Sequence, residues 1–199
     1  PGYTNVYLMR TWNLLALGQI GDAEAARESS QAWQAWLDHT DRHGLTEYSS
    51  PTYYGTDLDS LGLIARYADD PRIRREAVAA LSLVWASIAA NWFSPAERLA
   101  GPHSRDYDYL FGRGYLDEHL HGAGWLTSPP TTESSGWLPG APREHLRVFR
   151  DARRWDPPAE LRDEHAKRTP RFVIQRFNAE PWARSTNHIG ETLAIGVAG

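Results

Sequence analysis

The alternation between two kinds of helical segment limits most strongly what this 199-residue chain can fold into. Residues 3–18 and 57–69 carry apolar side chains on nearly all sides, as helices buried in a core do. Residues 22–43 and 71–92 instead carry one apolar stripe at helical spacing, opposite a charged face. The order buried, amphipathic, buried, amphipathic predicts inner and outer helices joined as repeated antiparallel hairpins.

A weak internal repeat supports this arrangement. Residues 14–22 resemble residues 61–69, at an offset of about 47 residues. Inner and outer helices in a repeat are typical of an α/α toroid rather than of a four-helix bundle, in which every helix is half exposed. We therefore expect a mainly α fold, built from the antiparallel helical hairpins of an incomplete α/α toroid and followed by a short β tail.

Composition divides the chain into three regions. Residues 1–125 are predicted to form the α/α-toroid hairpins, with a short helix at 115–121 near their end. Residues 126–168 form a long loop, rich in Pro, Ser, Thr and Gly, and then an irregular charged segment. Residues 169–199 read as the start of a β region.

Two segments of that last region alternate like strands, at residues 171–177 and 191–198. The final one reads as a strand without a partner. The sequence also begins at Pro1 rather than at a Met. We therefore expect the chain to be a fragment whose fold is completed by another chain or by a missing segment.

Charge and composition exclude several classes of function. The net charge of −4 provides no basic surface for nucleic acid or an anionic membrane. No apolar run is long enough to span a bilayer. The absence of Cys excludes disulfides and thiolate catalysis, and it leaves the compartment open. Nine Trp and nine Tyr fit a carbohydrate-binding cleft, although a large helical core explains the same count.

Residues 46–55 and 101–112 are two loops that concentrate tyrosines, charges and turn-forming residues. One helical hairpin separates them. In an antiparallel array every second connection lies at the same end, so we expect the two loops to meet. Asn5, at the start of the first helix, falls at that end too, where it could cap the helix or bind a substrate carboxylate.

The second loop carries the strongest candidates for chemistry. A Gly-Pro turn presents His103 and Arg105 beside the phenol groups of Tyr107 and Tyr109. His titrates near neutral pH, Arg binds a carboxylate at two points, and a Tyr hydroxyl can transfer protons. The alternative is a structural turn in which Arg105 pairs with a neighbouring aspartate.

The first loop adds Glu47, Tyr48, Tyr53 and Tyr54. Glu47 could act as a general acid or base, or it could orient His103 across the cleft. The alternative is a solvated carboxylate, with tyrosine rings that pack on helix ends.

Other polar groups are predicted to be structural. Asp57 and Asp59 suit a helix start, because Thr56-x-x-Asp59 is close to a capping box. Two His pairs have the spacing of zinc ligands, but no Glu joins either pair in a zinc-protease arrangement: His39 and His43, and His119 and His121. We expect no metal and no cofactor.

These elements resemble the toroid portion of heparinase II/III-like polysaccharide lyases and of other α/α-toroid carbohydrate-active enzymes. The matching segments are Tyr3-Thr-Asn5 before a buried helix, the loop Glu47-Tyr-Ser-Ser-Pro-Thr-Tyr53, and Gly101-Pro-His-Ser-Arg105 with its tyrosines. The tail, from Arg184-Ser-Thr-Asn-His to Leu193-Ala-Ile-Gly196, resembles the passage into the β-domain of such enzymes. The chain differs from them because it has no Asn-His pair on one helix and too few hairpins to close a toroid.

The resemblance implies cleavage of a uronate-containing polysaccharide by metal-independent β-elimination. Asn5 and Arg105 would neutralise the carboxylate, His103 would be the base, and Tyr107 or Tyr53 would be the acid. Tyr54 and Tyr109 would line the substrate site.

Three alternatives stay open beside a lyase. A glycoside hydrolase on the same scaffold would use carboxylates such as Glu47 and Asp108 as acid and base. A non-catalytic module would bind carbohydrate or a partner protein through its aromatic loops. A dehydratase or isomerase would act on another small-molecule substrate.

Overall fold

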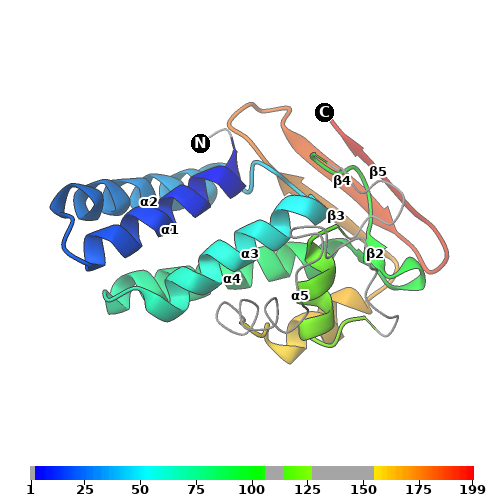
Figure 1. Cartoon of the computed structure of the whole chain (residues 1–199). Helices are drawn as coiled ribbons and strands as arrows, with labels where there is room; N and C mark the ends of the chain where they lie inside the picture. The colour runs from blue at the N-terminus through cyan, green and yellow to red at the C-terminus, as the bar shows by residue number, and fades with distance from the viewer. Residues whose placement is uncertain (1–2, 106–113, 127–154) are drawn as a thin grey trace.

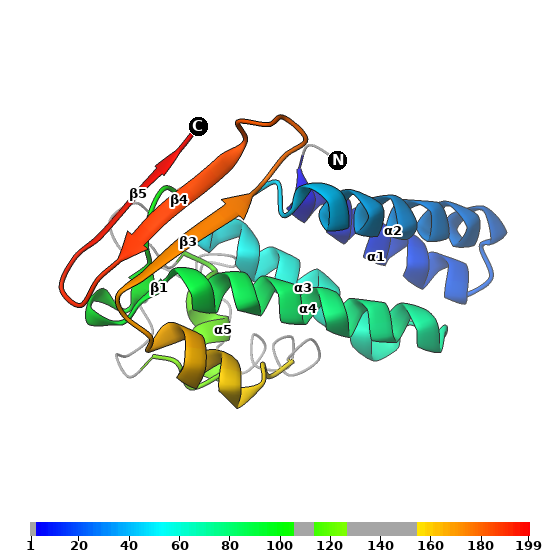
Figure 2. The same cartoon turned by 180° about the vertical axis from the view of Figure 1, so that it is seen from behind.

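The computed structural model describes residues 3–105, 114–126 and 155–199. It is mainly helical, and an antiparallel sheet formed by the last part of the chain lies at one end of the helices (Figures 1 and 2). The helices are α1 (Thr4–Gln19), α2 (Ala23–His43), α3 (Pro51–Tyr67), α4 (Pro71–Asn91) and α5 (Leu116–Gly122), with a 3-10 turn η1 (Ser94–Ala96) and a π-helical turn η2 (Leu161–Ala166). The strands are β1 (Trp92–Phe93), β2 (Arg98–Leu99), β3 (Arg171–Arg176), β4 (Arg184–Ile189) and β5 (Ala194–Ala198).

Three of the four long helices begin at a side-chain cap. Asp22 accepts from two N–H groups at the start of α2, at 3.0 Å each. Ser50 accepts from Tyr53 N–H at the start of α3, and Asp70 accepts from Arg72 N–H at the start of α4. Such caps satisfy N–H groups that have no partner within the helix. At α1, Tyr3 occupies the cap position without a side-chain bond, so the first turn needs a partner from elsewhere.

The four long helices form two antiparallel hairpins that lie side by side (Figure 1). α1 packs against α2, α3 packs against α4, and the hairpins meet along α1 and α3. Their short links lie at the same end, where the Gln19 side chain binds Tyr67 O and Asp69 N–H at 3.0 and 2.8 Å. The predicted placement of these links is therefore confirmed.

Large side chains from all four helices fill the core between the hairpins. Trp33 and Trp36 of α2 stack on each other with ring centroids 5.6 Å apart, and both are 1% exposed. The largest fully buried side chains share this core: Trp33, Trp36, Trp85, Tyr54, Leu8, Leu58, Leu61, Ile64, Leu81, Ile88, Leu116 and Leu120. Much of the Trp content therefore serves packing.

Two helix predictions need correction. α1 is not buried all round, because Val6 and Leu17 are 55% and 46% exposed. α3 begins at Pro51 rather than at residue 57, so Asp57 lies inside the helix and the predicted capping box around Thr56 is wrong. The Ser50 cap and a proline in the first turn set the true start.

The C-terminal sheet has the order β3-β4-β5, with antiparallel neighbours. The prediction of an unpaired last strand is wrong, because β5 pairs with β4 along its whole length. β3 is close to its predicted range, whereas β4 was not predicted as a strand. The side chains of β3 alternate toward and away from the helices, and four apolar residues stay largely exposed on the outer face: Phe172, Ile174, Ile195 and Val197.

The remaining described elements cover the helices. α5 packs against α3, where Gly55 allows close contact: a Cβ there would lie 2.7 Å from the backbone of Tyr115. η2 packs against α4. Residues 127–154, which include most of the predicted long loop, lie outside the described residues. None of the described helices has the length and apolar character needed to cross a membrane.

Candidate functional site

The two loops singled out in the sequence do meet. Ser104 N–H donates to Tyr48 O at 3.1 Å, and Ser50 Oγ donates to Arg105 O at 3.5 Å. The predicted convergence of the loops at one end of the hairpins is therefore confirmed. We call this contact region, residues 47–50 with residues 103–105 and the start of α1, the loop junction.

Glu47 joins the first loop to α1. Its Oε2 accepts from Asn5 N–H at 3.0 Å, and the N–H of Thr4 also binds its carboxylate. The side chain is 2% exposed. Glu47 therefore supplies the cap that Tyr3 does not, and its negative charge suits the positive end of the helix. Neither Thr4 nor Asn5 is the cap residue, and Glu47 is not the solvated carboxylate of the alternative interpretation.

A second carboxyl group lies near Glu47 inside the protein. Asp57 of α3 is 1% exposed, and neither of its oxygens has a hydrogen-bond partner among the described residues. Burial, and then repulsion from Glu47, raises the pKa of Asp57 well above its ordinary value. Burial also raises the pKa of Glu47, against the hydrogen bond from Asn5 and the charge of Arg105. Burial and the nearby Glu47 thus favour the protonated form of Asp57, whereas the N–H groups of α1 and the charge of Arg105 favour the charged form of Glu47.

Arg105 connects the second loop to the start of α1. Its Nη2 donates to Tyr3 Oη at 3.1 Å, and its guanidinium carbon lies 5.1 Å from the centroid of the Tyr3 ring. Arg105 is exposed, and Tyr3 is 54% exposed. The backbone of Arg105 has φ 55°, a left-handed conformation that non-glycine residues adopt at a cost. The pair presents a cation and an aromatic ring to solvent together.

His103 lines a cavity of about 320 Å³ between the second loop and the β4–β5 turn. Arg98, Gly101 and Thr192 contribute to the same wall. Gly101 is required here, because it has φ 82° and a Cβ would lie 2.0 Å from Asn187 Oδ1. Close packing of the loop on β4 therefore fixes the position of His103.

The two tyrosines of the first loop have different environments. Tyr53 is partly exposed in the first turn of α3, and its N–H donates to Ser50 Oγ at 3.2 Å. Tyr54 is 1% exposed, and its hydroxyl lies 2.9 Å from Ser87 Oγ. Burial raises the pKa of Tyr54 to about 12, so this hydroxyl keeps its proton at physiological pH.

The other predicted site residues, Tyr107 and Tyr109, lie outside the described residues, as does Asp108. The structure thus brings together Asn5, Glu47 and Arg105 near the first turn of α3, whereas the side chain of His103 lines the cavity beside the β4–β5 turn. Sequence reasoning did not assign a role to Tyr3 itself. The signal in the sequence was its position two residues before Asn5, at the end of the hairpins where the two loops were predicted to meet.

Polar side chains also meet around Asp59, on α3. Tyr115 Oη donates to Asp59 Oδ2 at 2.7 Å, and His119 Nε2 lies 3.1 Å from Asp59 Oδ1. These contacts attach α5 to α3. His39 and His43 lie with ring centroids 5.0 Å apart, and burial, ahead of the positive charges of His43 and Arg42, lowers the pKa of His39. Within the described ranges, no three His, Asp or Glu side chains group as metal ligands.

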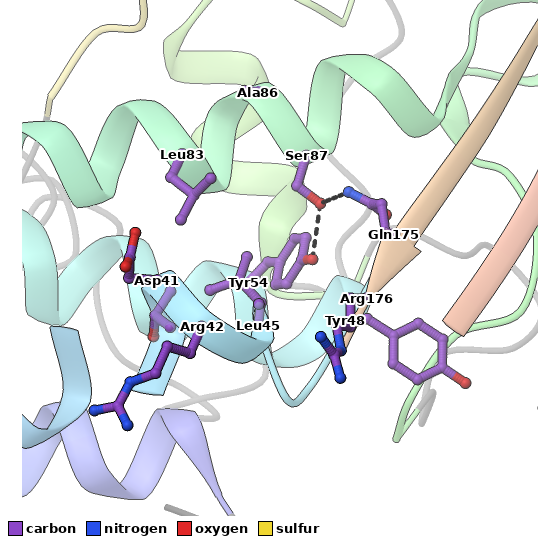
Figure 3. Close-up of a pocket in the computed structure, with 12 residues that line it drawn as sticks. Asp41, Arg42, Leu45, Tyr48, Tyr54, Leu83, Ala86, Ser87, Gln175 and Arg176 are labelled. Atoms are coloured by element: carbon purple, nitrogen blue, oxygen red, sulfur yellow. Dashed lines mark hydrogen bonds between the residues drawn. The ribbon is translucent and has the colours of Figure 1, made fainter. Parts of the chain in front are cut away.

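A buried polar network joins the helices to the sheet on the other side of the loop junction. Gln175 Nε2 donates to Ser87 Oγ at 2.8 Å, and Asn91 Nδ2 donates to Gln175 Oε1 at 2.7 Å. Asn187 Nδ2 then donates to Asn91 Oδ1 at 2.6 Å. With Tyr54, these side chains link α3, α4, β3 and β4. Part of the network lines a second cavity, of about 380 Å³ (Figure 3).

The fold and the loop junction define a mainly helical protein with a C-terminal antiparallel sheet and a loop-built candidate site. Residues 1–115 match the sequence profile of a family described as a domain of unknown function, DUF8769, so the chain belongs to that family. The match covers the four long helices and both junction loops. No curated protein and no solved structure matches the chain.

Proposed function

We propose that the chain is the helical part of an α/α-toroid carbohydrate-active enzyme that cleaves an acidic polysaccharide by β-elimination. The observation that carries the proposal is the loop junction, where Arg105 and His103 come from one short loop fixed to α1 and α3. A carboxylate-binding group and a proton acceptor, both carried by this loop, are what elimination next to a carboxylate needs.

The arrangement of the hairpins supports the toroid part of the proposal. α1 and α3 pack together, α2 and α4 lie on their flanks, and the short links share one end. Repeated hairpins of this kind are the units of α/α toroids and solenoids. The exposed Val6 and Leu17 on α1 fit packing against a further hairpin.

The reaction assigns a separate task to each group. Arg105 neutralises the uronate carboxylate, which makes the proton on C5 more acidic, and His103 removes that proton. The electrons of the C5–H bond form a C4–C5 double bond and expel the oxygen on C4. A tyrosine, Tyr53 or Tyr107, donates a proton to the leaving oxygen.

Glu47 takes a different part from the one expected of an acid or base. It is buried and its carboxylate binds the N–H groups of α1, so it positions the loop rather than meeting substrate. Asn5 is likewise 8% exposed, and its N–H is committed to Glu47. Its side chain is therefore a weaker candidate than Arg105 for binding the carboxylate. The burial of Glu47 also counts against a hydrolase that would use it as acid or base.

The test is the ultraviolet absorbance of the unsaturated product when the chain is mixed with uronate polymers. We expect wild-type turnover, with a loss of at least about 100-fold in His103→Ala, as for removal of a general base. Arg105→Ala should lose activity and Arg105→Lys should recover part of it, because lysine keeps the charge but not the two-point contact. His188→Ala and Arg27→Ala, on the outer sheet face and on α2, are the matched controls.

Three results would reject the lyase. Reducing ends without ultraviolet absorbance would indicate hydrolysis. Polymer binding without turnover, unchanged by His103→Ala, would indicate a non-catalytic module. Full activity in His103→Ala would remove the proposed base.

A further inference from the structure

The second cavity lies between α2, α4 and β3, and His103 does not line it. Its volume, about 380 Å³, is within the range of small-molecule sites. On one side Leu83, Ala86 and Ser87 project from α4, and Leu45 and Tyr54 lie opposite them (Figure 3). The walls are therefore largely apolar, and the polar groups of Ser87, Tyr54 and Gln175 form what we call the polar floor.

The polar floor is held in place before any ligand binds. Ser87 Oγ meets both Tyr54 Oη, at 2.9 Å, and Gln175 Nε2, at 2.8 Å (Figure 3). Gln175 is fixed in turn by Asn91. A floor fixed by its own hydrogen bonds needs little reorganisation on binding.

Arg176, at the end of β3, is exposed and is one of the residues that line the same cavity. Its Nε and Nη2 donate to the carbonyls of Asn178 and Ala179 at 3.1 and 3.0 Å. Over residues 3–105, 114–126 and 155–199, no carboxylate lies within ion-pair distance of this guanidinium. In the view of Figure 3, Arg176 lies between Leu45 and the ring of Tyr48. A fixed guanidinium without a counter-charge beside a cavity favours an anion.

The charges around Arg176 also favour a bound anion. Arg184 lies directly opposite Arg176 in the β3–β4 register, and like charges facing each other across a sheet repel. Arg42 also lines the cavity, although it binds Asp38 on its own helix. Asp41 is the single acidic lining residue, against two arginines. A bound anion would relieve the repulsion between Arg176 and Arg184.

The end of α2 holds the wall of the cavity against β3. Gly44 has φ 78°, and a Cβ there would lie 2.0 Å from Arg176 O. This contact leaves no space for a side chain, so the end of α2 packs directly on the backbone of β3.

We propose that this cavity binds a ring-sized organic carboxylate, with the carboxylate on Arg176 and the ring against Leu45, Leu83 and Ala86. The ligand could be a sugar acid or a free acid with an apolar ring, because both present the same charged group on a six-membered ring. The site is separate from the proposed catalytic centre, and its ligand need not be a substrate.

The test titrates the chain with glucuronate, cyclohexanecarboxylate, neutral methyl glucoside and inorganic phosphate, and follows the backbone amides of Gly44 and Gln175 by NMR. We expect at least one ring acid to bind with a dissociation constant of about 1 mM or tighter, and more weakly at high salt. Preference for glucuronate identifies a sugar acid, and preference for cyclohexanecarboxylate identifies an apolar acid. Either result supports the proposal.

Two variants and two controls assign the binding to this cavity. Arg176→Ala should weaken binding about tenfold, which is the loss of one charge-assisted contact. Ala86→Leu should block the ring by filling its space. Arg27→Ala, and Ala79→Leu on the exposed side of α4, should leave binding unchanged.

Several outcomes would overturn the proposal. Equal binding of the neutral glucoside would remove the role of the cation, and equal binding of phosphate would remove the role of the ring. Unchanged binding in Arg176→Ala and Ala86→Leu would place the ligand elsewhere. No binding by either acid would reject the site. Each binding measurement is made on wild type and again on the His103→Ala background. The binding result is therefore independent of catalytic turnover.

Discussion

Asn5 N–H donates to Glu47 Oε2 at 3.0 Å, across 42 residues of sequence. The start of the first helix is thus capped by the loop between α2 and α3, rather than by its own preceding residue. Because that loop also contacts the His103 loop, one carboxylate supports both the first turn of α1 and the candidate site.

Glu47→Ala should therefore lower the free energy of unfolding by about 1–3 kcal/mol, since buried N–H groups at the start of α1 lose their acceptor. Urea denaturation followed by circular dichroism measures this change. Glu24→Ala is the control, because the Glu24 side chain is 83% exposed in the first turn of α2. Equal effects of the two substitutions would show that Glu47 is not a cap.

Asp57 should make the protein less stable as pH rises. Its pKa in the folded state is well above the ordinary value of 3.8, so the folded state keeps a proton that the unfolded state releases. The contribution is complete below about pH 4 and is lost as pH rises toward the folded pKa, at about 1.4 kcal/mol per pH unit for one proton.

Asp57→Asn keeps the shape of the neutral acid and removes the titration. We expect its free energy of unfolding to fall less than that of wild type between pH 5 and pH 8. Asp38→Asn, at a half-exposed position on α2, should preserve the wild-type pH dependence. A wild-type slope retained in Asp57→Asn would mean that Asp57 is charged when folded.

The helices could be predicted from the sequence because their apolar periodicity and their caps are local. The bounds of α2 and α4 were predicted to within one or two residues. The rule that every second connection of an antiparallel array lies at the same end was enough to place the two loops together. The start of α3 was missed because Tyr53-Tyr54-Gly55 reads as a turn, whereas Gly55 lies inside α3 and leaves space there for the backbone of Tyr115.

The environment of each site residue could not be predicted in the same way. Glu47 and Asp57 are both acidic and close in sequence, but their burial and mutual repulsion are set by the packing of the first loop against α1 and α3. Likewise β4 was missed because Ser185 and Asn187 are polar. Both side chains are buried, and Asn187 donates to Asn91, 96 residues away.

Gly101→Ala should strongly destabilise the second loop. The new Cβ would lie 2.0 Å from Asn187 Oδ1 on a backbone with φ 82°, so both packing and conformation oppose it. We expect a loss of about 2–4 kcal/mol in thermal or chemical denaturation. Gly122→Ala is the control, because a Cβ there meets nothing within 4 Å. A Gly101→Ala protein as stable as the control would contradict the close packing of loop and strand.

Asp59→Ala should release α5 without unfolding the core. The substitution removes the contacts of Asp59 with Tyr115 and His119, which hold a helix of seven residues that is too short to be stable alone. Hydrogen exchange should accelerate at the amides of α5 and stay slow in α1. Unchanged exchange in α5 would show that its apolar contacts suffice.

The buried amides of Asn91 and Asn187 have a consequence for how the sheet assembles. Side chains on a strand alternate between faces, so a shift of β4 by one residue would turn Asn187 outward and bring Thr186 or His188 against α4. The amide of Asn91 would then be left inside without its partner, at a cost that apolar contacts do not replace. The Asn91–Asn187 hydrogen bond therefore selects a single register of β4 as the sheet packs against the helices.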